Sequence, residues 1–144
     1  MFRIRTATAK DALILARLHG EIFPEDAWTK EWFASRLKQK RMNFLVAEDA
    51  GRPIGLSALS IVADAAEILT IGLLSEQRGK GWGGRLLHDA LRLPVSHFFL
   101  EVAADNQAAI SMYKSVGFQE AGRRSAYYKA GTDAIVMVRS QPDP

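Results

Sequence analysis

The 144-residue chain has no cysteine, only five prolines and no apolar run approaching the roughly 20 residues that a transmembrane helix needs. The missing cysteines exclude disulfide bonds, thiolate metal ligands and a cysteine nucleophile. The first residues, MFRIRTATAKDA, also lack the long apolar segment of a secretory signal. We therefore expect a cytoplasmic protein that does not associate with membranes.

Composition and charge are typical of a globular protein, with 48% hydrophobic and 24% charged residues. The net charge of +3 favours an anionic ligand, but no basic block is present, and we expect no direct nucleic-acid binding. The length predicts one domain over residues 1–140, followed by a frayed tail at Gln141–Pro144. His19, His88 and His97 lack metal-ligand spacing, so we expect them on helix or strand surfaces, with no metal bound.

The first half of the chain mixes strand and helix patterns. Residues 2–6 alternate in polarity and predict an edge strand, and apolar residues at helical spacing predict a helix over 13–22. Thr29 is a candidate N-cap for a second helix. Further strands are predicted over residues 44–48, 53–63 and 66–74.

The second half is more regular. A glycine-rich loop over 78–84 leads into a predicted helix over 84–93. A strand over 97–102 precedes a helix over 106–116 that Gly117 closes. The string YYKAGTDAIVMV predicts an aromatic strand, a turn and a closing strand. Strands early and late with helices between them indicate an α/β or α+β protein with a sheet of mixed direction.

The glycine-rich loop is the most informative stretch, with four glycines among residues 79–84. Glycine lets the backbone approach a ligand closely, and N–H groups at the start of the following helix favour negative charge. Cationic side chains flank these glycines. A turn with a purely structural role would need only one or two glycines. The segment therefore predicts phosphate contacts from Arg78, Gly79, Lys80, Gly81, Trp82, Gly83 and Gly84.

Two other phosphate-binding patterns can be compared with this loop. The Walker A pattern fails, because no Gly-Lys-Ser/Thr follows. The dinucleotide pattern GxGxxG is present at Gly79, Gly81 and Gly84, and Glu101 lies about 20 residues further on. However, four residues separate the preceding strand from the first glycine, and that fingerprint normally opens its domain. The dinucleotide hypothesis is therefore disfavoured.

Two motifs together resemble the signatures of the GNAT superfamily of acetyltransferases. The first is the Arg-x-x-Gly-x-Gly loop of Arg78, Gly81 and Gly83, and the second is the string LEVAADNQAAISMYKSVGF, with Asn106 and Tyr113. The strings AEILTIGL and RRSAYYKAGTDAIVMV make the chain most similar to the RimI-like branch. The match is specific from about Glu67 to Val138, and looser over FPEDAWTKEWFASRL.

The resemblance implies a GNAT fold, with a mostly antiparallel sheet of about seven strands and four helices, splayed between the fourth and fifth strands. It implies acetyl-CoA as cosubstrate, with the pantetheine inserted beside Ile71, Gly72 and Leu73, where a β-bulge would free an N–H for the thioester carbonyl. It also implies transfer to a protein N-terminus, such as the N-terminal alanine of a small-subunit ribosomal protein. The implied peptide contacts are Trp28, Tyr127 and Tyr128. The helical spacing of Trp28 with Trp32 is also typical of a core residue, and alternation lets one of the two tyrosines face the groove and the other the core.

Acetyl transfer to an amine needs a base for the ammonium and an acid for the departing thiolate. Glu101 follows the apolar run HFFL, where desolvation could raise its pKa, and the resemblance implies that it is the base; the alternative is a carboxylate paired with Arg or Lys at the sheet edge. Tyr113 is the acid candidate or a core aromatic residue. Asn106 contacts the pantetheine, caps its helix, or does both.

Without cysteine, a covalent acyl-cysteine route is excluded, and direct attack of the amine on the thioester in a ternary complex is the simplest alternative. The leading hypothesis is therefore an N-terminal protein acetyltransferase. One alternative is a GNAT enzyme that acetylates small amines or lysine side chains. Another is a non-catalytic module that binds acetyl-CoA.

Overall fold

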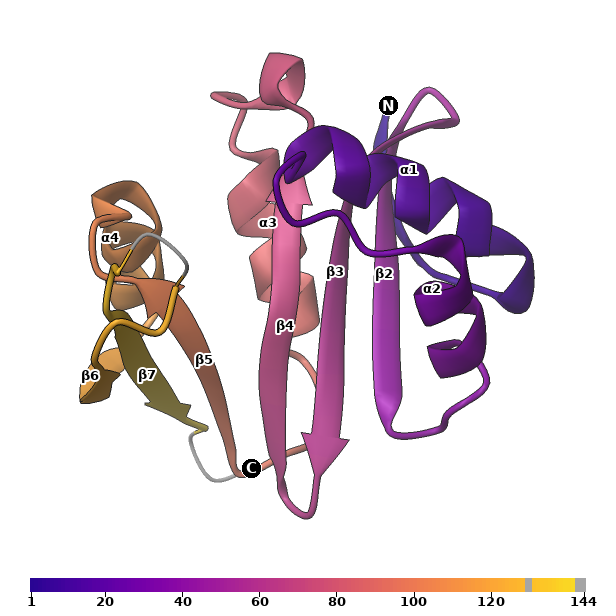
Figure 1. Ribbon diagram of the computed structural model, residues 1–144. Helices are drawn as coiled ribbons and strands as arrows, with labels where there is room; N and C mark the ends of the chain where they lie inside the picture. The colour runs from indigo at the N-terminus through magenta and orange to yellow at the C-terminus, as the bar shows by residue number, and fades with distance from the viewer. Residues whose placement is uncertain (129–130, 142–144) are drawn as a thin grey trace. The chain divides into compact units, whose positions relative to one another are not determined.

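The computed structural model describes residues 1–128 and 131–141 (Figure 1). Its chain divides into two compact units, Met1–Ile61 with Ile68–Leu93, and Val62–Glu67 with Pro94–Pro144. Residues 142–144 of the expected tail lie outside the described residues. The N–H of Gln141, the first residue of that tail, donates to the Ser96 carbonyl at 2.8 Å.

The sheet has seven strands in the order β1-β2-β3-β4-β5-β7-β6. The β4–β5 pair is parallel, whereas β1–β2, β2–β3, β5–β7 and β6–β7 are antiparallel. Together with four α-helices, this confirms the predicted fold class. The strands are β1 (Phe2–Thr6), β2 (Met42–Asp49), β3 (Arg52–Val62), β4 (Ala65–Leu73), β5 (His97–Ala103), β6 (Gln119–Arg124) and β7 (Ala134–Ser140).

In the first unit, three α-helices accompany the strands. Helices α1 (Ala12–Ile22) and α2 (Lys30–Arg36) lie next to each other on one side of the strands, and α3 (Trp82–Ala90) lies on the other (Figure 1). The short helices η1 (Ala9–Asp11) and η2 (Ser75–Gln77) precede α1 and α3. Thr29 caps α2 as predicted, because its hydroxyl accepts from the Trp32 N–H at 3.0 Å.

In the second unit, the start of β4 pairs with β5 over three residues, Ala65–Glu67 against His97–Phe99. Strand β5 also pairs along its whole length with β7. Helix α4 (Gln107–Ser115) is followed by the C-cap Val116 and then by Gly117, whose φ of +99° confirms the predicted glycine stop.

Two predictions of secondary structure were wrong, one about the start of a helix and one about the position of a strand. Helix α3 begins at Trp82, two residues before the predicted start, because Gly81 already provides the left-handed cap. The predicted aromatic strand at Tyr127 is absent, since Tyr127 and Tyr128 follow a turn. The strand that pairs with β7 is β6, whose six residues are all exposed and so carry no apolar alternation.

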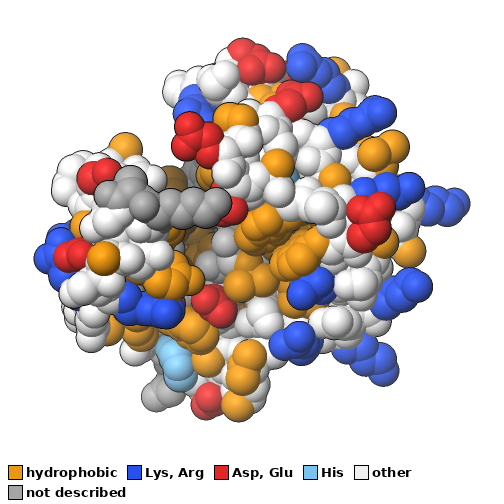
Figure 2. Space-filling view, in the orientation of Figure 1, with side chains coloured by type: hydrophobic (Ala, Val, Ile, Leu, Met, Phe, Trp, Pro, Cys, Tyr) orange, Lys and Arg blue, Asp and Glu red, His pale blue; other side chains and the backbone are white. Residues whose placement is uncertain are grey.

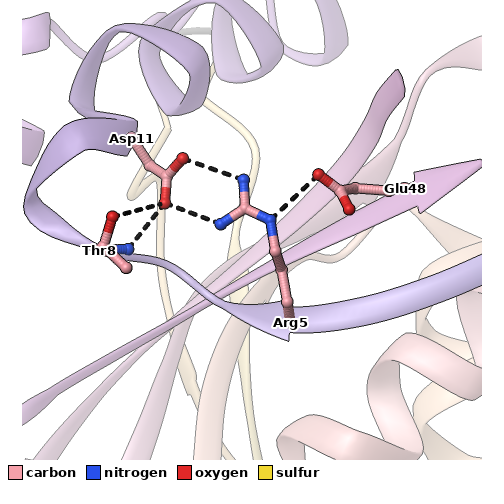
Figure 3. Close-up of polar contacts among 4 residues, drawn as sticks. All are labelled: Arg5, Thr8, Asp11 and Glu48. Atoms are coloured by element: carbon pink, nitrogen blue, oxygen red, sulfur yellow. Dashed lines mark hydrogen bonds and ion pairs between the residues drawn. The ribbon is translucent and has the colours of Figure 1, made fainter. Parts of the chain in front are cut away.

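An ion-pair network joins β1, β2 and the start of α1 (Figure 3). The Arg5 guanidinium donates to both carboxylate oxygens of Asp11, at 2.8 and 2.9 Å, and to Glu48 at 3.0 Å. The Thr8 N–H also donates to Asp11, at 2.7 Å. The Arg5 hydrogen bonds are the main reason that the pKa of Asp11 falls to about 2. The network fixes the chain direction where β1 turns into α1.

The expectation that all three histidines lie on surfaces was wrong for His19, which is 2% exposed. Its ring stacks on Trp28 at 4.3 Å, and its Nδ1 accepts from the Trp28 N–H at 3.2 Å. Phe23 and Phe33 also contact the ring. Burial lowers the pKa of His19, while the charge of Asp26 acts in the opposite direction. His19 therefore packs as a neutral core residue that holds the segment between α1 and α2.

No helix in the described part of the chain has both the length and the apolar character needed to cross a bilayer.

We predict that Asp11→Ala lowers the free energy of unfolding by about 3 kcal/mol, because it leaves Arg5 half-paired and removes the acceptor for Thr8. In the wild type, the Asp11 contribution is present above its ordinary pKa of 3.8 and is lost as pH falls toward 2. Urea denaturation at pH 2.5–7 measures both effects. Asp49→Ala, which removes the exposed ion pair with the N-terminus, is the control and should cost under about 1 kcal/mol. Equal losses in the two variants would contradict a structural role for Asp11.

We predict that His19 makes the fold less stable in mild acid. The lowered pKa means that the unfolded chain takes up this proton at a higher pH than the folded chain, so stability falls as pH drops below about 6.5. His19→Gln keeps an acceptor for the Trp28 N–H and should lose less stability between pH 7 and 5 than the wild type does. Urea denaturation at both pH values tests this. His88→Gln, at an exposed position, is the control, and identical pH dependence in all three proteins would contradict the prediction.

Candidate active site

The predicted phosphate loop forms a bend of left-handed backbone that opens directly into α3. Gly79 and Gly81 have φ of +83° and +81°, a region that disfavours residues with a Cβ. Gly81 is the N-cap and has no side chain to accept from the first turn. The N–H groups of Trp82, Gly83 and Gly84 therefore lack intrahelical acceptors and are available to a ligand. Their positive helix end favours an anion.

The cations predicted around this loop are present, and an aromatic stack anchors the start of α3. Arg78 and Lys80 are exposed, and the Lys80 ammonium lies 4.7 Å from the centre of the Trp82 ring. The Trp82 ring stacks on Phe2 of β1 at 4.8 Å, and the Arg85 guanidinium covers the same phenyl ring. On the face in Figure 2, further Lys and Arg side chains gather over α1 and α2, away from this loop.

A short helix separates β4 from the loop. Strand β4 ends at Leu73, and η2 follows before Gly79. In dinucleotide-binding folds, the strand runs almost directly into the first glycine. The insertion of η2 therefore disfavours the dinucleotide-binding hypothesis.

Residues Ile71–Leu73, the predicted thioester-binding strand, form the end of β4 and belong to the first unit, as the glycine-rich loop does. Gly72 contacts the end of α1 so closely that a Cβ there would meet Ile22 at 2.8 Å and Phe23 at 3.2 Å. A side chain at position 72 would push α1 from the strand. The β-bulge expected at Ile71–Leu73 stays a prediction.

Trp28, a predicted peptide contact, lies in the segment between α1 and α2 and is half-buried. Besides His19, its ring contacts Trp32 at 4.3 Å and Phe33 at 6.0 Å. These aromatic contacts make Trp28 part of the packing of the α1–α2 segment. A peptide contact, if made, would come from its remaining exposed edge.

In the second unit, the catalytic candidate Glu101 pairs with an arginine. The Nη1 of Arg124 donates to Glu101 Oε1 at 2.9 Å, so the ion pair that the sequence left open as an alternative is present. The second oxygen, Oε2, is buried and has no hydrogen-bond partner among the described residues. Burial and, to a smaller extent, the charge of Glu101 raise the pKa of Glu67. Glu101 thus has one oxygen held and one free.

Tyr113, the acid candidate, is 8% exposed and packs edge-on against Phe118 at 5.6 Å. Burial raises its pKa to about 12. The phenol is therefore protonated across the physiological range. The core position that the sequence allowed is confirmed, and it is compatible with proton donation.

Asn106 caps α4, since its Oδ1 accepts from the Ala109 N–H at 3.2 Å. One of the two functions considered for it is thus present. The amide nitrogen is not used by this cap. Tyr127 is exposed and Tyr128 half-buried; the two rings meet edge-on at 5.1 Å, just after β6.

Sequence reasoning missed two charged neighbours of Glu101. Glu67 lies in the string AEIL and Arg124 in the string RRSAYY, both quoted only as family resemblance. Alternation along β4 could have suggested the face of Glu67, but β6 has no apolar alternation that would indicate the face of Arg124. The proximity of these two residues to Glu101 depends on how the strands align. Among the described residues, no three ligating side chains gather into a metal site.

Comparison with known proteins places these features in a family. The acetyltransferase (GNAT) family model matches residues 13–118. The chain is 34% identical to N-alpha-acetyltransferase RimI of Mycobacterium tuberculosis, over 98% of this chain and 94% of that protein. Its structure is similar to that of the ribosomal-protein-S18-alanine N-acetyltransferase from Escherichia coli, with a TM-score of 0.91, 26% identity and coverage of 100% and 96% of the two chains.

Arabidopsis thaliana NAA60 in complex with acetyl-CoA has the same fold, with a TM-score of 0.82 at 21% identity, covering 97% of this chain and 98% of that chain. The dinucleotide hypothesis finds no support in these relatives. The phosphate loop, the carboxylate on β5 and the tyrosine on α4 occur here in a chain that belongs to the GNAT family of acetyltransferases.

Proposed function

We propose that this chain transfers the acetyl group of acetyl-CoA to the N-terminal amine of a protein, with the N-terminal alanine of a small-subunit ribosomal protein as the candidate acceptor. The observation that carries the proposal is the similarity to N-alpha-acetyltransferase RimI along 98% of the chain. The proposal requires residues 1–140 to act as one catalytic domain, in the cytoplasm.

The first unit would hold the cofactor. Free N–H groups at the start of α3, with Arg78 and Lys80 nearby, suit the pyrophosphate of coenzyme A. Ile71, Gly72 and Leu73 would lie along the pantetheine, and the Asn106 amide would donate to it. These roles are supported by the positive-φ cap at Gly81 and by the family, in which NAA60 is known with acetyl-CoA bound.

The second unit would move the protons. The absence of cysteine leaves direct attack by the amine. Glu101 would take the ammonium proton through its free Oε2, directly or through water, and Tyr113 would give a proton to the departing thiolate. A pKa of about 12 keeps Tyr113 protonated until that step. Trp28, Tyr127 and Tyr128 would contact the acceptor peptide.

Two other functions give different results. A GNAT enzyme for small amines or lysine side chains would acetylate peptides whose N-terminus is blocked. A non-catalytic acetyl-CoA-binding module would show no turnover in the wild type, and Glu101→Gln and Tyr113→Phe would keep its cofactor affinity.

We predict that Gly81→Ala weakens acetyl-CoA binding about tenfold, because a Cβ at φ +81° strains the cap and turns the first N–H groups away. Isothermal titration measures the affinity. Gly51→Ala is the matched control: its φ is +80°, its Cβ would also meet nothing within 4 Å, and it lies in the β2–β3 turn. Both variants should lose about 1 kcal/mol of stability. An affinity loss that is equal in the two variants would show that strain alone, and not the loop, causes it.

We predict transfer to peptides with a free N-terminus and none to the same peptides with a blocked N-terminus. Glu101→Gln should lower kcat at least about a hundredfold with little change in the KM for acetyl-CoA, because the base acts after the cofactor is bound. Mass spectrometry of the products and steady-state kinetics test both statements. Equal acetylation of blocked peptides that contain lysine would favour the lysine or small-amine alternative.

A further inference from the structure

We propose that Arg124 is a positioning residue for the reaction: it holds one oxygen of the Glu101 carboxylate, so that the other oxygen is left to accept the proton of the acceptor amine. The inference rests on the proposed function, because that function assigns proton transfer to Glu101. All the residues that carry it belong to the second unit.

The contact itself is a short charge-assisted hydrogen bond. Arg124 Nη1 and Glu101 Oε1 are 2.9 Å apart, and the two side chains are 53% and 23% exposed. Glu101 Oε2, by contrast, is buried without a partner among the described residues. Burying a carboxylate oxygen without a hydrogen bond costs desolvation free energy, so an unpaired oxygen of this kind needs an explanation. A role as the proton acceptor explains why Oε2 has no partner.

Strand register explains why Arg124 reaches Glu101. Glu101 lies opposite Val136 on β7, and Val136 lies opposite Gly122 on β6. Arg124 is two residues beyond Gly122 and so shares its face of the sheet. Its side chain then crosses β7 diagonally, over a strand whose facing residues are small or apolar, to meet Glu101.

A register shift between Glu120 and Gly122 selects Arg124 rather than its neighbour. The shift leaves Ala121 without an opposite residue on β7. One extra residue reverses which side chains point to each face. Without it, Arg123 would lie on the face of Glu101. Instead, Arg123 pairs with Asp133 at 2.9 Å.

Two other groups lie near the Glu101–Arg124 pair. Burial and, to a smaller extent, the charge of Glu101 raise the pKa of Glu67 on β4, whereas Arg124 pairs with Glu101 itself. The guanidinium lies 4.1 Å above the ring of Tyr127, a proposed peptide contact. The groups around Glu101 are thus Glu67 from β4, Arg124 from β6 and Tyr127 from the following turn, while β7 contributes the apolar Val136. Arg124 joins the proposed base to the proposed peptide-binding turn.

The experiment is a double-mutant cycle on acetyl transfer to a peptide with an N-terminal alanine. We compare Arg124→Gln, Glu101→Gln and the double variant with the wild type. Arg124→Gln should lower kcat about tenfold and leave the KM for acetyl-CoA unchanged. In the Glu101→Gln background, the same change should have less than about a twofold effect, because its target is gone.

Two further variants separate positioning from general structure. Arg124→Lys keeps a donor for Oε1 and should recover part of the lost kcat. Arg123→Gln, one residue away and similarly exposed, should stay within about twofold of the wild type. Because exposed ion pairs contribute little to stability, thermal unfolding should change little in all of these variants. Should Arg124→Gln fail to fold, the cycle is run with Arg124→Lys.

The pH dependence of kcat gives an independent readout. In Arg124→Gln, the Glu101 carboxylate loses its paired cation while the like charge of Glu67 stays nearby, and both changes favour the protonated carboxyl group at higher pH. The acidic limb of the profile should therefore move to higher pH in Arg124→Gln and stay in place in Arg123→Gln. An unmoved limb, or an Arg124→Gln effect that is equally large with and without Glu101, overturns the role of Arg124. A wild-type protein that leaves free N-termini unmodified overturns the proposed function itself.

Discussion

The left-handed backbone at Gly81 is the constraint on which the proposed cofactor-binding half of the site depends. It lets α3 begin without a side-chain cap and so leaves the first N–H groups of the helix to a ligand. The direction of those groups is in turn fixed by Trp82, which stacks on Phe2 of β1. Strand β1 is held by the Arg5 network with Asp11 and Glu48. An anion-binding geometry in one loop thus relies on an ion-pair network in the same unit.

Much of this architecture could be predicted from the sequence, because local chemistry determines it. The helix stop at Gly117 and the caps at Thr29 and Asn106 depend on residues within one turn, and all three are present. The glycines of the predicted phosphate loop indicated both the bend and the helix that follows it. The predicted start of that helix differed from the observed start by two residues. The seven-stranded mixed fold followed from the family resemblance and from strand patterns.

The remaining features depend on tertiary contacts. Strand β6 has six exposed residues, so its pairing with β7 left no periodic signal. His19 is buried by aromatic residues from the following segment, which its own helix does not reveal. The contact of Arg124 with Glu101 depends on a register shift of one residue between β6 and β7. The alternation of polarity along a strand does not indicate how that strand is aligned with its neighbour. For this reason the candidate base was predicted, but the ion pair around it was left as one of two alternatives.

The exposed strand β6 has a further consequence. It ends the strand order of the sheet, carries Glu120, Arg123 and Arg124, and has an irregular register with β7. Charges and bulges at an edge strand prevent another extended chain from adding to the ladder. Copies of this protein are therefore protected from edge-to-edge polymerisation through β6. For the same reason, an acceptor peptide is not expected to bind at β6 by adding an eighth strand, and the contacts proposed for it come from side chains such as Tyr127.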